Sequence, residues 1–385
     1  MIAITKMLTG EATVSKKLTY QSDSKIPKKL VEFSRNLVPI VVWNVTLKCN
    51  LNCLHCYASA GKKVEELKTE ECFNIIDQLA EIKVPTILFS GGEPLLRNDI
   101  FEVAEYANSK GINCVLSTNG TLITEKMAEK LKDSGFIYVG VSIDGLEKTH
   151  DTFRGLKGSF KKAFEGLINV KNAGILSGIR FTLTKYNILE VEGVIDLLAE
   201  NEIDRFCLYH LVPSGRAEFE DDVSNTERRK LVDFLINKSI ELSDNGYNTE
   251  IMTVDNPADG IYVYLKLKEI DEELANSAIE FLKYRGGDNS GVRLANIDPF
   301  GNLHPNQFWW DYTIGNLMEN SFKDLWFGDD ELLVKLRNKT NFLKGKCRIC
   351  QFKSVCGGFR LRALRAGDLW GEDPSCYLYL DEITI

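Results

Sequence analysis

Residues 48–57, Lys48-Cys49-Asn50-Leu51-Asn52-Cys53-Leu54-His55-Cys56-Tyr57, follow closely on an apolar run at 39–45 and carry three thiols at a Cys-x3-Cys-x2-Cys spacing. The apolar run predicts a buried strand, so the thiols fall in the loop at its end. Three thiolates fill three irons of a cubane cluster, which ordinarily takes four cysteines, and they leave one iron open to another ligand. The alternative is structural zinc, which needs four protein ligands. His55 lies between the second and third cysteines, where it cannot easily complete a tetrahedron.

Strand and helix patterns alternate six times from residue 39 onward. We predict strands at 39–45, 86–89, 114–116, 138–143, 178–183 and 206–211, and helices at 64–83, 99–110, 125–133, 160–172 and 191–200. Consecutive strands joined by helices form a parallel sheet, and right-handed crossovers make it curl. Six units are too few for a closed eight-stranded barrel, and active sites in barrels lie at the carboxyl ends of the strands. The predicted fold class is α/β.

Three segments are expected along the chain. Residues 1–37 lack strong periodicity and predict an N-terminal capping segment. Residues 38–285 hold the curled sheet and a helical extension, with a short further strand near 249–254. A polar, glycine-rich break at 285–291 precedes the last segment, 286–385.

Composition and charge narrow the class of protein. The chain has 385 residues and a formal net charge of −8, which disfavours nucleic acid as its main partner. Residues 1–17 mix charged and polar side chains without the apolar core of a secretory signal. No apolar run approaches the roughly 18 residues that a membrane span needs. We therefore expect a cytoplasmic protein without a membrane span.

The ten cysteines are not expected to form disulfides, because a reducing cytosol disfavours them. Three of them stand alone among apolar neighbours and are expected to be small buried side chains: Cys72, Cys114 and Cys207. Four more form a Cys-x2-Cys-x5-Cys…Cys pattern near the C-terminus: Cys347, Cys350, Cys356 and Cys376. This spacing suits either zinc or a four-iron cluster.

The spacing of Cys49, Cys53 and Cys56 resembles that of the radical S-adenosylmethionine (SAM) superfamily. The resemblance implies a partial (β/α)6 TIM-like barrel that holds a [4Fe–4S] cluster on these three catalytic cysteines. It implies that the amino and carboxylate groups of SAM chelate the open iron. An electron from the cluster then cleaves SAM to a 5′-deoxyadenosyl radical, which abstracts hydrogen from the substrate.

The same resemblance implies SAM contacts at the strand ends. Gly91-Gly92-Glu93-Pro94 would bind the SAM amino group, since two glycines let backbone polar groups approach a ligand closely. Ser117, Thr118 and Ser142 would bind the ribose and the methionine end. Ordinary strand-terminal turns are the alternative for these three residues.

Two larger side chains complete the expected SAM site. Arg180 lies in an otherwise apolar strand, and a buried guanidinium must be paired. Its partner is expected to be the SAM carboxylate or, alternatively, a neighbouring acid such as Asp144. Tyr57 resembles the aromatic residue that packs beside the adenine.

The C-terminal cysteines resemble the SPASM/Twitch auxiliary domain, which favours a second [4Fe–4S] cluster over zinc. Four ligands saturate such a cluster, so it suits electron transfer or substrate positioning rather than catalysis at an open iron.

Segments along the whole chain are similar to the AhbC/NirJ group of radical SAM enzymes: residues 1–6, 207–216, 304–309, 357–363, 367–370 and 372–377. One branch of that group removes the two acetate side chains of 12,18-didecarboxysiroheme to give Fe-coproporphyrin III. The other removes propionates in heme d1 biosynthesis. We favour the first branch, which implies an iron-tetrapyrrole substrate and a reduced ferredoxin or flavodoxin-type electron donor.

Two other classes remain open. A peptide-modifying SPASM maturase commonly carries an extra N-terminal domain that grips a leader peptide, and residues 1–37 look short for one. A non-enzymatic iron–sulfur carrier would not need a SAM pocket.

A flat, carboxylate-rich macrocycle requires apolar faces and cations, and several residues are candidates to supply them. The candidate substrate contacts are Tyr209, His210, Arg216, His304 and Trp309. Further candidate faces are Phe308, Trp310 and Trp370, and further candidate clamps are Arg360, Arg362 and Arg365. The alternatives are core aromatics, a hydrogen-bonded structural histidine and solvent-facing arginines.

Overall fold

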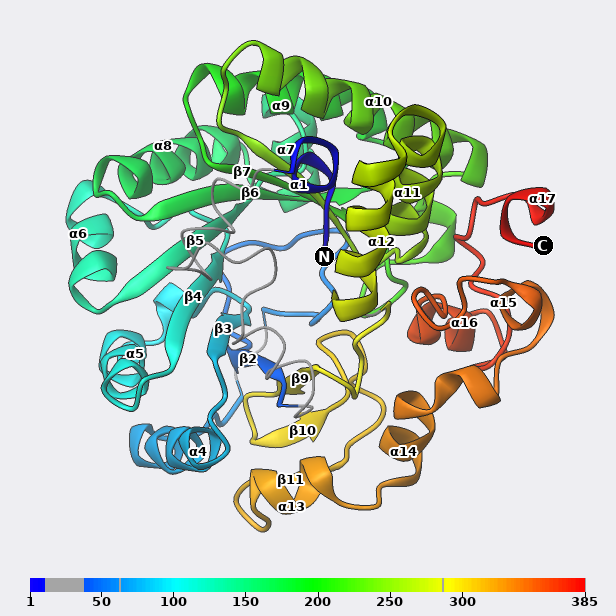
Figure 1. Cartoon of the computed structure of the whole chain (residues 1–385). Coiled ribbons are helices and arrows are strands. Elements are labelled where there is room, and N and C mark those ends of the chain that lie inside the picture. Colours follow the sequence, from blue (N-terminus) through cyan, green and yellow to red (C-terminus); the bar gives the residue numbers. More distant parts are fainter. Residues whose placement is uncertain (11–37, 62–63, 286, 385) are drawn as a thin grey trace.

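The computed structural model describes residues 1–10, 38–61, 64–285 and 287–384, and eleven strands among them form one sheet (Figure 1). Its order is β1-β8-β7-β6-β5-β4-β3-β2-β9-β10-β11. The six predicted strands form its parallel centre: β2 Ile40–Thr46, β3 Thr86–Gly91, β4 Asn113–Thr118, β5 Phe136–Ser142, β6 Leu176–Leu183 and β7 Arg205–His210. The predicted α/β class with a curled parallel sheet is confirmed.

Helices on the outside of the curved sheet follow the strands β2 to β6 (Figure 1). They are α4 Thr69–Glu81, α5 Ile100–Ser109, α6 Glu125–Asp133, α7 Glu147–Arg154, α8 Ser159–Asn172 and α9 Val191–Glu200. In α4, buried Cys72, Ile75, Ile76 and Leu79 recur at helical spacing, which explains why the sequence pattern predicted it. Helix α7 was not predicted, because its eight residues are mostly polar.

The sheet extends beyond the six predicted strands at both edges. The predicted strand near 249–254 is β8, Glu250–Val254, which pairs in parallel with β7. β1, Ile2–Ala3, pairs with β8 and leads into α1, Ile4–Thr9. Of the expected capping segment 1–37, residues 11–37 lie outside the described residues.

At the other edge, β9 Leu294–Ile297 pairs in parallel with β2. β10 Asn302–His304 and β11 Gly315–Asn316 follow in antiparallel order. The sheet therefore continues across the boundary that we expected at 285/286. These strands are too short to give a clear periodic signal in the sequence.

The helical extension before that boundary consists of α10 Asn225–Asp244, α11 Ala258–Ile270 and α12 Glu272–Arg285. The C-terminal part carries short helices: α13 Phe322–Phe327, α14 Glu331–Arg337, α15 Gly345–Ile349, α16 Arg360–Arg365 and α17 Leu380–Ile383. Short 3-10 helices lie at Pro94–Leu96, Ile188–Glu190, Phe219–Asp221 and Lys339–Asn341.

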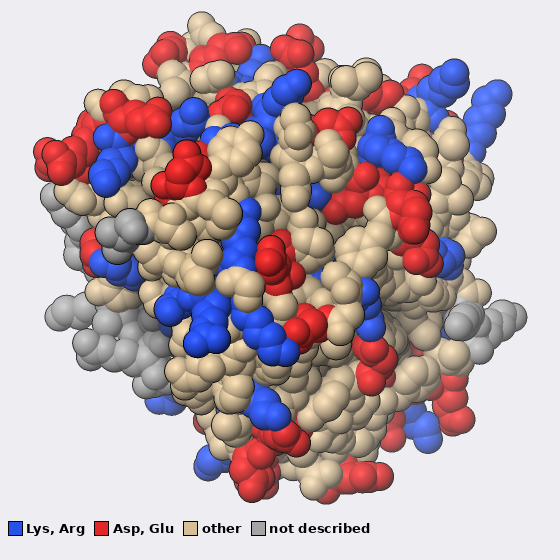
Figure 2. Space-filling view, turned by 90° about the vertical axis from the view of Figure 1, so that its right-hand side faces the viewer, with Lys and Arg blue, Asp and Glu red and all other residues tan. Residues whose placement is uncertain are grey.

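The main core lies between the sheet and its helices. Cys72, Cys114 and Cys207 are buried, as predicted. No helix in the part of the chain that the structure describes is both long and apolar enough to cross a membrane. Figure 2 shows the face on the right of Figure 1, where α15 and α17 lie; acidic and basic side chains alternate there, with Lys and Arg gathered near the middle.

Candidate functional site

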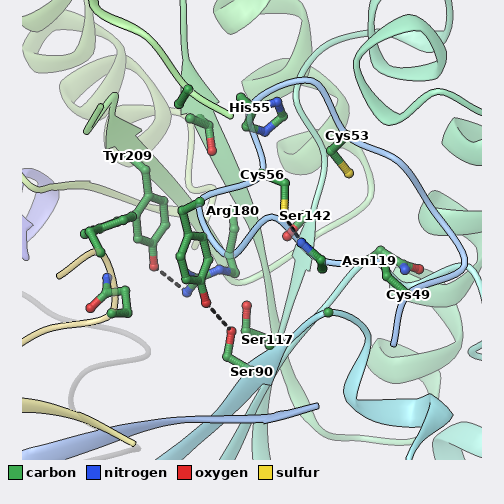
Figure 3. A pocket seen from close by; sticks show the side chains of 18 of the residues that line it. Cys49, Cys53, His55, Cys56, Ser90, Ser117, Asn119, Ser142, Arg180 and Tyr209 are labelled. Atoms are coloured by element: carbon green, nitrogen blue, oxygen red, sulfur yellow. Dashed lines mark hydrogen bonds between the residues drawn. The ribbon is translucent and has the colours of Figure 1, made fainter. Parts of the chain in front are cut away.

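A cavity opens at the carboxyl ends of the parallel strands, where sites of barrel-like folds form. Its wall combines the loop that follows β2 with residues at or near the ends of β3, β4, β5, β6 and β7. Figure 3 shows the loop that carries Cys53, His55 and Cys56 beside the strand ends that carry Ser90, Ser117 and Arg180. The six-strand topology thus brings together side chains that lie more than 100 residues apart in sequence.

All three cysteines of the first motif line this cavity. Each sulfur has an N–H donor: Leu51 N at 3.5 Å from Cys49 Sγ, Ala60 N at 3.4 Å from Cys56 Sγ and Arg154 Nη1 at 3.4 Å from Cys53 Sγ. Burial raises the pKa of Cys49 to about 11, so a bound metal would have to displace its proton. Three thiols, each with a donor suited to a thiolate, fit a cluster with one open iron.

The loop is fixed to the scaffold through its backbone. Asn52 N donates to Arg154 O at 3.2 Å and Leu54 N to Phe153 O at 2.9 Å, so helix α7 holds its middle. Arg216, beyond β7, donates from Nε to Cys53 O at 2.8 Å and from Nη1 to Ala60 O at 3.2 Å. These contacts position the sulfurs independently of any bound group.

The Gly91-Gly92 turn closes against the start of the same loop. Gly91 has φ +130°, and a Cβ on Gly92 would lie 2.2 Å from Lys48 O. Gly92 N donates to Thr46 O at 2.7 Å, and Glu93 N to Lys48 O at 2.8 Å. Glycine is required because the two backbones approach so closely.

Unlike the other expected SAM contacts, Glu93 does not line the cavity, and its side chain is fully buried. Its carboxylate accepts from Thr118 Oγ1 at 2.8 Å, Asn119 N at 2.7 Å and Leu95 N at 3.1 Å. Burial raises its pKa despite these donors. The carboxylate therefore ties the end of β3 to the end of β4.

The other expected SAM contacts converge on the cavity: Tyr57, Gly91, Gly92, Ser117, Thr118, Ser142 and Arg180. The Tyr57 hydroxyl donates to Asn44 Oδ1 at 2.7 Å, and its ring meets Phe308 edge-on with centroids 5.3 Å apart. Arg180 donates to the Tyr209 hydroxyl and lies 4.2 Å from the centroid of that ring.

The alternative pairing of Arg180 with Asp144 is wrong. Asp144 is fully buried and contacts Arg154 Nη2, His55 Nε2 at 3.2 Å and Thr182 N at 2.8 Å. Burial acts to raise its pKa, but the Arg154 guanidinium and His55 hold that pKa well below its usual range. Sequence reasoning missed Arg154, because nothing in the polar pattern of α7 distinguishes it.

Of the expected substrate contacts, Tyr209, His210 and Arg216 line the cavity, together with Phe308. Sequence reasoning also missed Ser90, Asn119 and Gln307, which carry no motif of their own.

The remaining substrate candidates need correction, because none of them lines the cavity. Trp309 is 2% exposed and packs in an apolar cluster with Val212 and Phe359. His304 is buried, with Nδ1 2.8 Å from Tyr312 O, and Trp310 stacks on its ring.

The arginine candidates and Trp370 are engaged elsewhere. Arg360 and Arg362 are fully buried; Arg360 donates to backbone carbonyls, and Arg362 pairs with Asp373. Arg365 pairs with Asp311 near the surface, and Trp370 packs on Phe342. Two of these three arginines therefore belong to the interior, and the third forms an ion pair near the surface.

The four C-terminal cysteines line a second cavity: Cys347, Cys350, Cys356 and Cys376. Arg360 Nη2 lies 3.7 Å from Cys347 Sγ, and Gly358 N lies 3.5 Å from Cys356 Sγ. Among the described residues, no three His, Cys, Asp or Glu side chains are arranged to hold a single metal ion. A cubane cluster binds each thiolate through a separate iron, so its cysteine ligands stand farther apart than those of one zinc ion. Four cysteines are the ligand set that such a cluster needs.

The chain is similar in sequence to known proteins. Residues 43–198 match the sequence profile of the radical SAM superfamily. The chain is 44% identical to the Fe-coproporphyrin III synthase of Methanosarcina barkeri, over 100% of this chain and 99% of that protein. It is 39% identical to the pre-heme d1 synthase of Dinoroseobacter shibae, over 88% of this chain and 86% of that protein.

The fold is similar to a solved structure of Streptococcus suis SuiB bound to SAM, with a TM-score of 0.71 and 20% identity over 91% of this chain and 80% of that one. From the profile and the two relatives, the chain belongs to the radical SAM superfamily and is an enzyme that uses a [4Fe–4S] cluster and SAM.

Proposed function

We propose that this enzyme removes the two acetate side chains of 12,18-didecarboxysiroheme to give Fe-coproporphyrin III. The observation that carries the proposal is the 44% identity to an Fe-coproporphyrin III synthase along the entire chain. The aligned region spans both cysteine groups and the strand ends between them, so the comparison extends beyond the superfamily core.

In this proposal, Cys49, Cys53 and Cys56 hold the cluster, and their loop keeps the fourth iron free of protein ligands. When bound, the cluster and SAM supply a 5′-deoxyadenosyl radical that abstracts hydrogen from the substrate. The backbone of Gly91 and Gly92 would meet the SAM amino group, because these two residues line the cavity and have no side chains to cover their backbone.

Arg180 would meet the SAM carboxylate, because its half-buried charge has a neutral hydroxyl as its hydrogen-bond partner in the cavity. Ser117, Thr118 and Ser142 would hydrogen-bond the ribose and the methionine end. Tyr57 would pack beside the adenine, held in place by its hydrogen bond to Asn44.

The macrocycle would occupy the outer part of the same cavity. Tyr209 and Phe308 would supply aromatic faces there. Arg216 uses two of its five N–H groups on the cluster loop, so others are left for a substrate carboxylate. His210 would act only as part of the wall, since both ring nitrogens are hydrogen-bonded within the protein.

We further infer that Cys347, Cys350, Cys356 and Cys376 hold an auxiliary [4Fe–4S] cluster. The support is a cavity lined by all four thiols and by few other polar groups. With no open position, such a cluster would carry electrons or position the substrate. A ferredoxin or flavodoxin-type protein would supply the electron for SAM cleavage.

Removal of propionates is the second candidate, favoured by the 39% identity to a pre-heme d1 synthase. The two reactions differ in product mass, so one experiment separates them. The reconstituted protein is incubated anaerobically with SAM, dithionite and didecarboxysiroheme, and the macrocycle is analysed by mass spectrometry. Loss of two acetates supports the proposal and loss of propionates supports the second candidate. An unchanged macrocycle alongside 5′-deoxyadenosine would refute both.

A further inference from the structure

The three sulfurs of the catalytic motif do not have equivalent donors. Cys49 and Cys56 face backbone N–H groups, whereas Cys53 faces the guanidinium of Arg154, with Nη1 3.4 Å from Sγ. Cys53 and Arg154 are each 8% exposed, so water screens this contact little. A charged donor in such surroundings binds a thiolate more strongly than an amide does.

A carboxylate offsets the Arg154 charge directly. Asp144 is fully buried and pairs with Arg154 Nη2, while its other oxygen accepts from Thr182 N at 2.8 Å. His55 Nε2 lies 3.2 Å from the same carboxylate. The sulfur, the guanidinium and the carboxylate therefore form a series of alternating charge once Cys53 is a thiolate.

Adding an electron to a cluster increases its negative charge. A hydrogen bond to a ligand sulfur and a nearby cation favour the reduced form and raise the reduction potential. A nearby buried carboxylate opposes reduction and lowers the potential. Both charges here lie within contact distance of the catalytic loop, so they act on the cluster with opposite sign.

We propose that Arg154 and Asp144 are positioning residues that set the reduction potential of the catalytic cluster, Arg154 raising it and Asp144 lowering it. Through this pair the protein can hold the cluster at a potential low enough to cleave SAM, while the Cys53 sulfur keeps a strong donor. The proposal concerns the cluster alone and holds for any substrate.

The chain contains a matched control that lacks a cluster. Arg97 donates from Nη2 to Cys72 Sγ at 3.2 Å and pairs from Nε with Asp99 Oδ1 at 2.8 Å. Arg97 is 7% exposed, and Cys72 belongs to neither cysteine group. Arg97→Gln makes the same chemical change as Arg154→Gln in a similar environment, so it separates loss of folding from an effect on the cluster.

The test is an EPR-monitored redox titration of the full-length, reconstituted protein without tetrapyrrole, in which the catalytic cluster is identified as the one whose signal changes on addition of SAM. We expect Asp144→Asn to raise the midpoint potential and Arg154→Gln to lower it. The double variant should lie between the two single variants. Arg97→Gln should leave the potential at the parent value.

Two outcomes would overturn the proposal: unshifted potentials in all the Asp144 and Arg154 variants, or shifts of the same sign in both single variants. Arg154→Gln leaves a buried carboxylate without its partner and is the variant at greatest risk of not folding. The comparison of Asp144→Asn with the double variant avoids that risk. It isolates the Arg154 contribution, which must appear as a lower potential in the double variant.

Discussion

His210 Nε2 lies 2.7 Å from Asp259 Oδ2 in the interior of the protein, and Arg228 Nη1 lies 2.6 Å from the other ring nitrogen. A guanidinium can only donate, so Nδ1 accepts and the histidine proton lies on Nε2. Burial lowers the pKa of His210, in keeping with a neutral ring. Tyr377, next to the last C-terminal cysteine, donates to Asp259 Oδ1 at 2.8 Å. Asp259 therefore joins the end of β7 to the C-terminal cysteine segment.

Asp259→Asn should destabilise the protein by about 2–3 kcal/mol, because a buried carboxylate that accepts two hydrogen bonds is replaced by a group with one acceptor oxygen. Urea unfolding measures the loss. Asp233→Asn is the control: Asp233 also accepts from a tyrosine, Tyr262, but its side chain is 42% exposed. Asp233→Asn should lower the free energy of unfolding by less than about 1 kcal/mol. Equal decreases for the two variants would contradict the role assigned to burial.

We expect His150 to make the fold sensitive to acid. Its ring is fully buried, and Asp144 N donates to Nδ1 at 3.2 Å. Burial, helped by the Arg154 charge, lowers the pKa of His150 from 6.5 to about 4. Between pH 6.5 and pH 4 the His150 side chain is protonated in the unfolded chain but stays neutral in the folded protein. The free energy of unfolding therefore falls as the pH drops from 6.5 to 4, by at most about 3 kcal/mol.

His150→Asn keeps an acceptor near the Nδ1 position and removes the titration. We expect the free energy of unfolding to fall less between pH 6.5 and pH 4 in this variant than in the parent. Unfolding curves at both pH values give the comparison. An identical loss in the two proteins would show that His150 does not control acid sensitivity.

Gly92→Ala should prevent the turn after β3 from closing on the cluster loop, since the new Cβ would lie 2.2 Å from Lys48 O. The expected result is lower iron incorporation and weaker SAM binding, measured by iron analysis and by equilibrium dialysis. Gly193→Ala is the control within helix α9, where the nearest atom to a Cβ is 3.5 Å away. That change should stabilise the helix by about 0.5–1 kcal/mol and leave iron unchanged.

The sequence was sufficient to predict the six central strands, because each is a compact apolar run followed by a helical pattern. It also placed the first cysteine group in the loop after β2. Side-chain partners were harder to predict. Asp144 lies just after the end of β5 and Arg180 lies on the neighbouring strand β6, and the sequence alone does not show which cation an acid contacts. For the same reason, the place of Glu93 in its motif does not reveal that the carboxylate turns inward to β4.

The C-terminal aromatic and arginine side chains show a second limit. Arg360, Arg362 and Trp309 have the residue types of a carboxylate-binding pocket, yet all three are buried. Their environment depends on how the short helices α14 to α16 pack, and short helices carry little periodic signal. Composition alone could not separate a binding surface from an interior stabilised by paired charges.

Removal of the C-terminal cysteine site should separate SAM cleavage from substrate conversion. The catalytic loop is anchored to β2, β3 and α7 through its own backbone contacts, whereas Cys350 and Cys356 belong to the segment around α15 and α16. We therefore expect Cys350→Ser combined with Cys356→Ser to lose about half of the iron, as one of two equal clusters would. The variant should still release 5′-deoxyadenosine with dithionite and lose side-chain removal. Cys114→Ala, in the core, should keep the full iron content, and full iron in the double variant would show that these thiols are not cluster ligands.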